Sequence, residues 1–152
     1  MIDITIRRAE FQDLEAIIAL LADDALGQAR EDNSRPLSER YATAFEAIDR
    51  DPNQLLAVVE HSLTIVGCLQ LTFVPGLSRL GMWRGQIESV RIASNQRGSG
   101  LGQRMFEWAI SECRARKCGL VQLTSDKARP DAIRFYEGLG FTASHEGFKL
   151  EL

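Results

Sequence analysis

A glycine-rich turn between an expected strand and an expected helix constrains this chain more than any other stretch. The turn reads Arg97-Gly98-Ser99-Gly100-Leu101-Gly102. Residues 86–92 alternate in the manner of a strand, and apolar side chains recur at helical spacing over 105–113. Glycine permits a sharp bend without a Cβ, and the first N–H groups of a helix lie unpaired at the positive end of its dipole. Such a turn is suited to phosphate, and Arg97 adds a positive charge.

Two familiar phosphate-binding loops do not match this turn. A Rossmann fingerprint that starts at Gly98 would need a third glycine where Gln103 stands, and a Walker loop would need lysine there. The pattern Arg/Gln-x-x-Gly-x-Gly/Ala is matched instead, by Arg97, Gly100 and Gly102. In this the segment resembles the pyrophosphate loop of the GCN5-related N-acetyltransferases (GNAT family).

A second motif nearer the C-terminus carries the same resemblance. Residues 132–141 look like the family's ending, in which an Ala-x-x-Phe-Tyr helix precedes Gly-Phe; here Phe135 and Tyr136 supply the aromatic pair. One position departs from the pattern. Many relatives have an asparagine seven residues before the tyrosine, where it meets the pantetheine arm, and this chain has Arg129. That contact is therefore not carried over, and Arg129 either approaches a phosphate or is solvated.

Periodicity along the chain predicts alternating strands and helices in one domain, residues 1–152. Strands are expected at 3–7, 54–60, 63–73, 86–92 and 120–124, with a C-terminal hairpin of 141–144 and 148–152. Helices are expected at 11–22, at 37–50 with Ser38 as N-cap, after the glycine turn, and from Pro130 to Gly140. Residues 23–36 are interpreted as a solvated connection, with a lid over the acceptor as the alternative. The fold class predicted is α/β of the α+β type: a mixed, mostly antiparallel GNAT sheet flanked by about four helices.

Composition narrows the class of protein. The chain has 152 residues and a formal net charge of −3, which argues against a nucleic-acid surface. No apolar run has the length of a membrane span, and the first residues lack the character of a signal peptide. Three cysteines without close pairing indicate a reducing compartment, so a cytoplasmic location is expected. With only two histidines besides, no metal site is predicted.

The resemblance implies acetyl-CoA as co-substrate. The implied binding residues are the end of the strand, the turn and two positions further on: Val90, Arg91, Ile92, Arg97, Gly98, Ser99, Gly100, Leu101, Gly102, Gln103, Arg129 and Phe135. It also implies a local splaying of the strand that frees a backbone N–H near Val90 or Ile92 for the developing oxyanion.

The chemistry of amine acetylation requires a proton acceptor and a proton donor. An alkylamine titrates near ~10.4, so it must lose a proton before it attacks a thioester. Glu88 can take that proton if partial burial raises its pKa, and the resemblance assigns it this role; the alternative is a structural ion pair with Arg84 or Arg91. Tyr136 can donate a proton to the departing thiolate; the alternative is an aromatic core residue.

The sequence gives conflicting indications of the charge of the acceptor. Arg79 and Arg84 favour an anionic acceptor, whereas the acidic stretch from Asp23 to Asp32 favours a polyamine or a basic peptide. The function predicted is acetyl transfer from acetyl-CoA to a primary amine of a small molecule by direct attack. The alternatives are a protein or peptide N-acetyltransferase and a non-catalytic CoA-sensing module. Neither nucleic acid nor membrane is expected as a partner, and a homodimer is compatible with the sequence.

Overall fold

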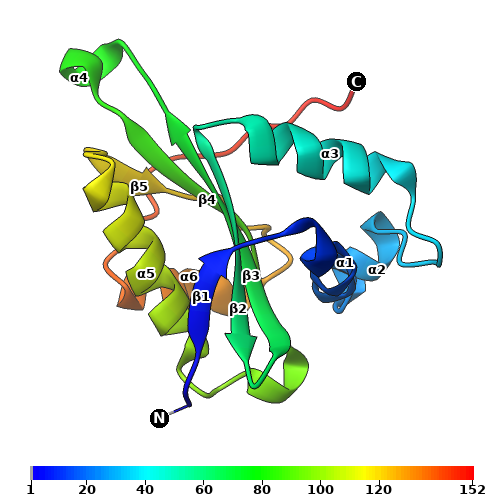
Figure 1. Cartoon of the computed structure of the whole chain (residues 1–152). Helices are drawn as coiled ribbons and strands as arrows, with labels where there is room; N and C mark the ends of the chain where they lie inside the picture. The colour runs from blue at the N-terminus through cyan, green and yellow to red at the C-terminus, as the bar shows by residue number, and fades with distance from the viewer. Residues whose placement is uncertain (1) are drawn as a thin grey trace. The chain divides into compact units, whose positions relative to one another are not determined.

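The computed structural model describes residues 2–152, which form two compact units, 2–122 and 123–152. Each unit is described by itself (Figure 1). The prediction of a single domain stays a prediction. Within the described residues, no helix combines the length and apolar character that crossing a membrane requires.

The first unit is built on a five-stranded sheet in the order β1-β2-β3-β4-β5 (Figure 1). Its first four strands pair antiparallel, while β4 and β5 run parallel over only three residue pairs. This confirms the mixed, mostly antiparallel sheet predicted from the sequence. The strands are β1 (Thr5–Arg8), β2 (Gln54–His61), β3 (Thr64–Val74), β4 (Arg84–Ile92) and β5 (Leu120–Gln122).

The longer helices of this unit lie where the 3.6-residue periodicity places them, and two short helices, over 25–30 and 78–81, are additions that the sequence did not predict. Ser38 caps the N-terminus of α3 as predicted, since its hydroxyl accepts from the Arg40 N–H. The connection over 23–36 is not wholly irregular, because it contains the short helix α2, capped by the Asp24 carboxylate. The helical segments are η1 (Phe11–Asp13), α1 (Leu14–Leu21), α2 (Ala25–Arg30), α3 (Glu39–Arg50), α4 (Ser78–Gly81), η2 (Ser94–Gln96) and α5 (Leu101–Ala115).

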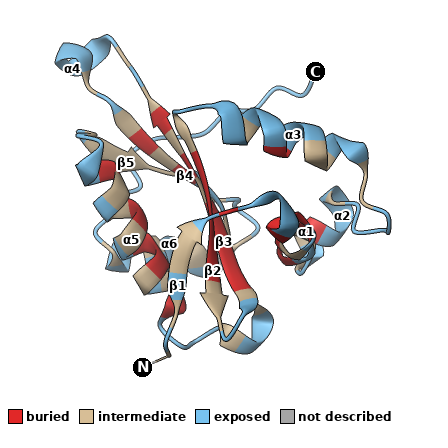
Figure 2. Ribbon diagram, in the orientation of Figure 1, coloured by how far each residue is buried: buried red, intermediate tan, exposed pale blue. Residues whose placement is uncertain are grey.

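Helices cover both faces of the sheet (Figure 1). On one face α1 and α3 pack over Leu56, Val58 and Cys68, and the buried residues follow β2 and β3 (Figure 2). On the other face α5 approaches the strands so closely that a Cβ at Gly85 would collide with the Cys113 sulfur. Nearer its start, α5 lies beside the end of β4, because a Cβ at Gly67 would lie 3.2 Å from the Met105 sulfur and 3.1 Å from the Arg91 carbonyl oxygen.

The buried polar group of this unit is held by an ion-pair network. Asp13 is 6% exposed, and its carboxylate accepts from the Arg7 guanidinium at 2.7 and 3.0 Å. Arg7 also donates to Glu60, which joins β1, η1 and β2. The hydrogen bonds from Arg7 lower the pKa of Asp13 below its usual value.

The second unit, residues 123–152, contains the helix α6 (Pro130–Gly138), as predicted. Beyond it Gly140 has a positive φ of 96°, the conformation expected of a helix-ending glycine. The predicted hairpin of 141–144 and 148–152 is wrong, because these residues form no strand in the structure. The apolar residues of the second segment are all exposed, at 92% for Phe148, 87% for Leu150 and 117% for Leu152, so the alternation in the sequence is matched neither by burial nor by a strand ladder.

Candidate active site

The glycine turn has the backbone that the sequence predicts for it. Gly98 and Gly100 adopt φ values of 78° and 82°, a region that favours glycine. A Cβ at either position would have no heavy atom within 4 Å, so the space over both is open. Gly100 caps α5 without a side-chain hydrogen bond, which leaves the first N–H groups of the helix available to a ligand. This arrangement suits an anion that approaches the backbone closely.

Arg97 in the turn and Arg91 near the end of β4 both face the acidic segment after α1. Arg97 Nη2 lies 3.9 Å from Asp23 Oδ2, and Arg91 Nε lies 4.0 Å from Asp24 Oδ2. The Arg91 Nε is buried and has no hydrogen-bond partner in the described part of the chain. A buried donor without a partner is costly, so the site has capacity for a further acceptor. Asp23 and Asp24 thus face two arginines, Arg97 and Arg91, that were predicted to bind the cofactor.

The strand irregularity that the resemblance implies is present in β4. Gln70 pairs with Glu88 and Cys68 with Arg91, so two residues of β4, Ser89 and Val90, oppose one of β3. Ser89 has a φ of 54°, consistent with a bulge. Since β5 pairs only with residues 84–86 of β4, no other strand of the first unit's described residues pairs with the outer edge of β4 beyond them. Backbone groups near Val90 and Ile92 can therefore meet a ligand.

Glu88 projects from β4 and is exposed, so the partial burial considered in the sequence analysis is absent. Its Oε1 lies 3.5 Å from the Thr72 hydroxyl. Among the described residues, Glu88 forms no ion pair; Arg91 pairs with Asp24 instead, and Arg84 has no acidic partner. The structural alternative for Glu88, a salt bridge to one of these arginines, is therefore not supported.

The remaining predicted residues, Tyr136, Phe135 and Arg129, belong to the second unit. Tyr136 is partly buried, and its ring contacts Phe135 and Phe141 edge-on at centroid distances of 5.6 and 6.2 Å. Arg129 stands at the N-cap of α6. Because the two units are described separately, the catalytic pairing of Tyr136 with Glu88 stays a prediction.

A row of polar side chains that the sequence did not predict crosses the first unit's sheet. The strand register pairs Gln54 with Thr72, Thr72 with Gln86, and Gln86 with Gln122, so all four share one face. Gln54 Oε1 accepts from Thr72 at 3.1 Å, and Gln122 Nε2 donates to Gln86 Oε1 at 3.0 Å. The period-two recurrence of polar residues in these strands was visible in the sequence. Their union into one row depended on the register.

The cysteines are poor candidates for nucleophiles. Burial raises the pKa of the Cys68 thiol to about 12 and that of Cys113 to about 11, which disfavours the reactive thiolate. Across residues 2–152, the structure brings together no group of three or more His, Cys, Asp or Glu side chains suited to a metal ion.

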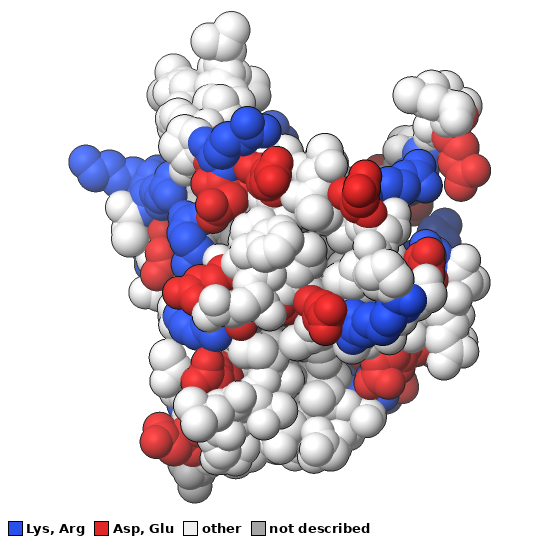
Figure 3. Space-filling model, turned by 45° about the vertical axis from the view of Figure 1, so that its right-hand side comes forward, with Lys and Arg blue, Asp and Glu red and all other residues white. Residues whose placement is uncertain are grey.

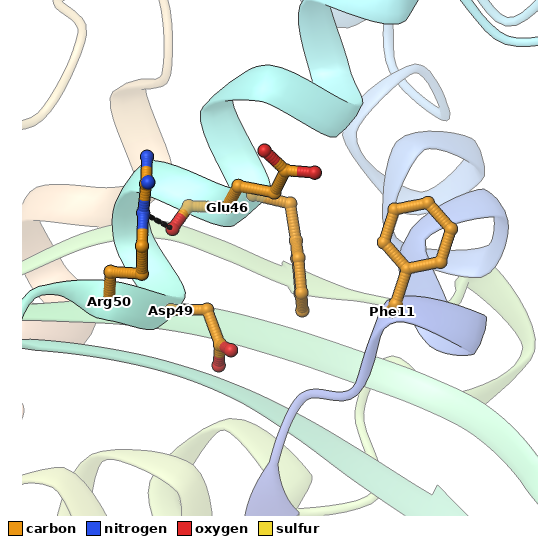
Figure 4. A pocket seen from close by; sticks show the side chains of 5 residues that line it. Phe11, Glu46, Asp49 and Arg50 are labelled. Carbon is orange, nitrogen blue, oxygen red and sulfur yellow. Dashed lines mark hydrogen bonds between the residues drawn. The ribbon is translucent and has the colours of Figure 1, made fainter.

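Two surface hollows lie at other places in the first unit. One of about 390 Å³ lies between η1 and α3; Figure 4 shows Phe11, Glu46, Asp49 and Arg50 around it. The Arg50 Nε there donates to the Glu46 carbonyl of its own helix. The other, of about 350 Å³, also uses Phe11 and the start of α3. Neither is lined by a predicted site residue, and both follow the seam between helices rather than the sheet and turn.

Comparison with known proteins agrees with this geometry. The sequence matches the acetyltransferase (GNAT) family over residues 15–141. A glucosamine 6-phosphate N-acetyltransferase of Trypanosoma brucei brucei is 31% identical over 155 residues, covering 100% of this chain and 98% of the relative. An aminoalkylphosphonate N-acetyltransferase of Salmonella typhimurium is 25% identical over 143 residues, covering 94% and 88%.

A crystal structure of a Bacillus halodurans C-125 protein, named as a transcriptional regulator, is 49% identical. It superposes with a TM-score of 0.96 and covers 99% of this chain and 100% of that one. The chain belongs to the acetyltransferase (GNAT) family, and by class it is an acetyltransferase. The resemblance carried by its two sequence motifs is confirmed.

Proposed function

We propose that the protein transfers an acetyl group from acetyl-CoA to a primary amine of a small molecule. The observation that carries this proposal is the glycine turn before α5, with its open space over Gly98 and Gly100 and the unsatisfied Arg91 donor nearby. Membership of the acetyltransferase family supports the choice of this co-substrate over other phosphate-bearing molecules.

The residues of the turn fit the anionic part of such a co-substrate. The N–H groups at the start of α5 bind the pyrophosphate, and Arg97 adds a charge beside them. The bulged end of β4, near Val90 and Ile92, provides backbone groups to the pantetheine arm and the thioester oxygen. Arg129 and Phe135 complete the proposed set. Acetyl-CoA, when bound, supplies an acyl group held as a thioester.

Two side chains move the protons of the reaction. Glu88 removes a proton from the acceptor's ammonium group, directly or through water, so that the nitrogen can bond to the acyl carbon as the carbon–sulfur bond breaks. Tyr136 gives a proton to the departing sulfur, and the second proton that the nitrogen loses as the amide forms restores the tyrosine hydroxyl. The products are an amide and the free CoA thiol, and no acyl-enzyme forms. Among the described residues Glu88 forms no salt bridge, which supports its role because no bound cation holds the carboxylate in its ionised form.

The experiment that tests this function follows release of the CoA thiol with a panel of primary amines. Wild-type protein should release thiol in proportion to amide, with at least one small amine preferred over peptides that carry a free N-terminus. Thiol release that is unaffected by any amine would contradict the transfer reaction.

The 49% identical neighbour, named as a transcriptional regulator, favours a second candidate: a regulatory module whose response depends on the cofactor. The net charge of −3 does not favour direct contact with nucleic acid. Figure 3 shows acidic and basic side chains intermixed on the face in view. This candidate predicts stabilisation by CoA without turnover of any amine, which thermal unfolding and the thiol assay distinguish.

A further inference from the structure

The face of the sheet that carries Glu88 also carries Arg84, which has no ion-pair partner among the described residues. Arg84, Gln86 and Glu88 alternate along β4 before its bulge, so their side chains leave the same face of the sheet. Arg84 lies four positions before Glu88, so their Cα atoms are roughly 13 Å apart along the strand. Among the described residues, no carboxylate forms an ion pair with Arg84. One face of β4 thus presents a guanidinium at the start of the strand and a carboxylate just before the bulge.

The surface between these two charges is polar and neutral. The row of Gln54, Thr72, Gln86 and Gln122 crosses the sheet there, and every member is partly exposed. The hydrogen bonds within the row use only some of its groups. Gln54 Oε1 accepts twice, from Thr72 and from Gln70, while no described residue accepts from the Gln54 amide N–H groups. Free amide donors and acceptors are suited to hydroxyl or amide groups of a ligand.

From this arrangement we infer that the acceptor is a small anionic amine, with its amine at Glu88 and its anionic group at Arg84. This inference rests on the proposed function and names the substrate class of the same site. The guanidinium recognises phosphate, phosphonate or carboxylate through paired N–H donors. A polyamine is disfavoured, because its second ammonium would lie beside Arg84. The acidic stretch does not offset this, since Asp23 and Asp24 face Arg97 and Arg91.

The test compares acceptors that differ only in the anion. Glucosamine is paired with glucosamine 6-phosphate, and 3-aminopropanol with 3-aminopropylphosphonate; spermidine serves as the polycation. In wild-type protein the anionic member of a pair should have the lower KM. Arg84→Gln should raise that KM about ten- to a hundred-fold, the range expected for loss of charge-assisted hydrogen bonds, and leave the neutral member unchanged. Arg84→Lys should restore part of the preference because it keeps the charge.

Two controls keep the outcome interpretable. Arg114→Gln removes an exposed arginine from the last turn of α5, on the opposite face of the sheet, and should leave every KM unchanged. Thermal unfolding of each variant, with and without the amines, reports folding and binding independently of turnover.

The proposed function and this inference fail in different ways. No thiol release with any amine would overturn the transfer reaction; stabilisation of wild type, but not of Arg84→Gln, by the anionic amine would still support the binding site. Equal KM values for both members of each pair, or an unchanged preference in Arg84→Gln, would overturn the inference alone.

Discussion

At the scale of single residues, Glu88 is the assignment with the sharpest experimental signature. Glu88→Gln keeps the size of the side chain and removes its basicity. At neutral pH the acceptor is mostly ammonium, so the variant should be slower by about 10²- to 10⁴-fold. As the pH approaches the amine's own pKa, near ~10.4 for an alkylamine, free amine accumulates and the deficit should shrink. The measurement is kcat/KM against pH for both proteins.

Folding must be checked at every pH of that profile. If Glu88 has only a structural role in the sheet, through its contact with Thr72, the Glu88→Gln variant should lose stability. Any deficit in its rate should then stay constant with pH. A constant ratio of the two rates would therefore argue against Glu88 as the base.

Asp13 gives a second prediction at this scale, concerning stability rather than catalysis. Its pKa is lowered in the folded protein, mainly by hydrogen bonds from Arg7, so its contribution is present above the unfolded-state pKa of ~3.9 and is lost as the pH falls below that value. Asp13→Asn should lower the free energy of unfolding at pH 7 by about 2 kcal/mol, less than for a fully buried pair because Arg7 is 30% exposed. Urea unfolding at pH 7 and pH 3 measures both values, and the difference should narrow at the lower pH. A difference that widens would contradict the linkage.

At the scale of elements, the turn before α5 predicts how cofactor binding can be separated from folding. Gly100 has a φ of 82°, and the space over it is open. Gly100→Val should strain the backbone and also block close approach of a pyrophosphate. Gly100→Asn is the matched variant, since asparagine tolerates this φ better yet still adds a side chain. Both should lose CoA affinity by at least tenfold, measured by calorimetry, while the asparagine variant melts close to wild type. Wild-type affinity in folded Gly100→Asn would remove the turn from the binding site.

The elements were predicted from the sequence where one periodic pattern settles the structure. Alternation located β2, β3 and β4, and helical spacing located α1, α3 and α5. The short helix α2 was missed because six residues around Gly27 carry too little periodicity, although Asp24 is a recognisable N-cap. The C-terminal hairpin was predicted wrongly. Alternation at Phe148 and Leu150 defines two faces of a segment but supplies no partner for its hydrogen bonds.

In the candidate site too, the features that are local in sequence were predicted and those that depend on long-range contacts were not. The glycine turn and its arginine are local in sequence, so they were predicted before the structure was known. The pairing of Asp23 with Arg97 joins residues 74 positions apart, and nothing in either neighbourhood specifies it. The polar row likewise required the register of four strands, which a one-residue slip would have moved to the other face.

At the scale of the whole molecule, the two units contribute different parts of the proposed chemistry. Tyr136→Phe keeps the ring that contacts Phe135 and Phe141, so stability should change little. If Tyr136 is the general acid, turnover should fall by roughly ten- to ten-thousand-fold while CoA still binds. The measurements are kcat with the best amine, CoA affinity and the melting temperature.

The other tyrosine of the chain provides the matched control. The Tyr41 hydroxyl accepts from the Asp32 N–H and donates to Glu31, away from the predicted site residues. Tyr41→Phe should therefore cost stability and leave turnover unchanged. Near-normal turnover in Tyr136→Phe would assign the proton to water or to another group.

The polar row on the sheet has a consequence for how such a protein can diverge. Along the strands, the members of the row alternate with residues that face α5; the row is Gln54, Thr72, Gln86 and Gln122. Among the residues that face α5, Leu71, Phe73 and Ile87 are almost completely buried. In the proposed site, a change in the row alters the surface that meets the acceptor and opens no void on the α5 side of the sheet. The row shares its own face of β2 and β3 with Leu56, Val58 and Cys68, which pack under α1 and α3. Duplicated copies could thus drift toward new amines while they keep the glycine turn, and a mutant library confined to these four positions should retain folding in most of its members.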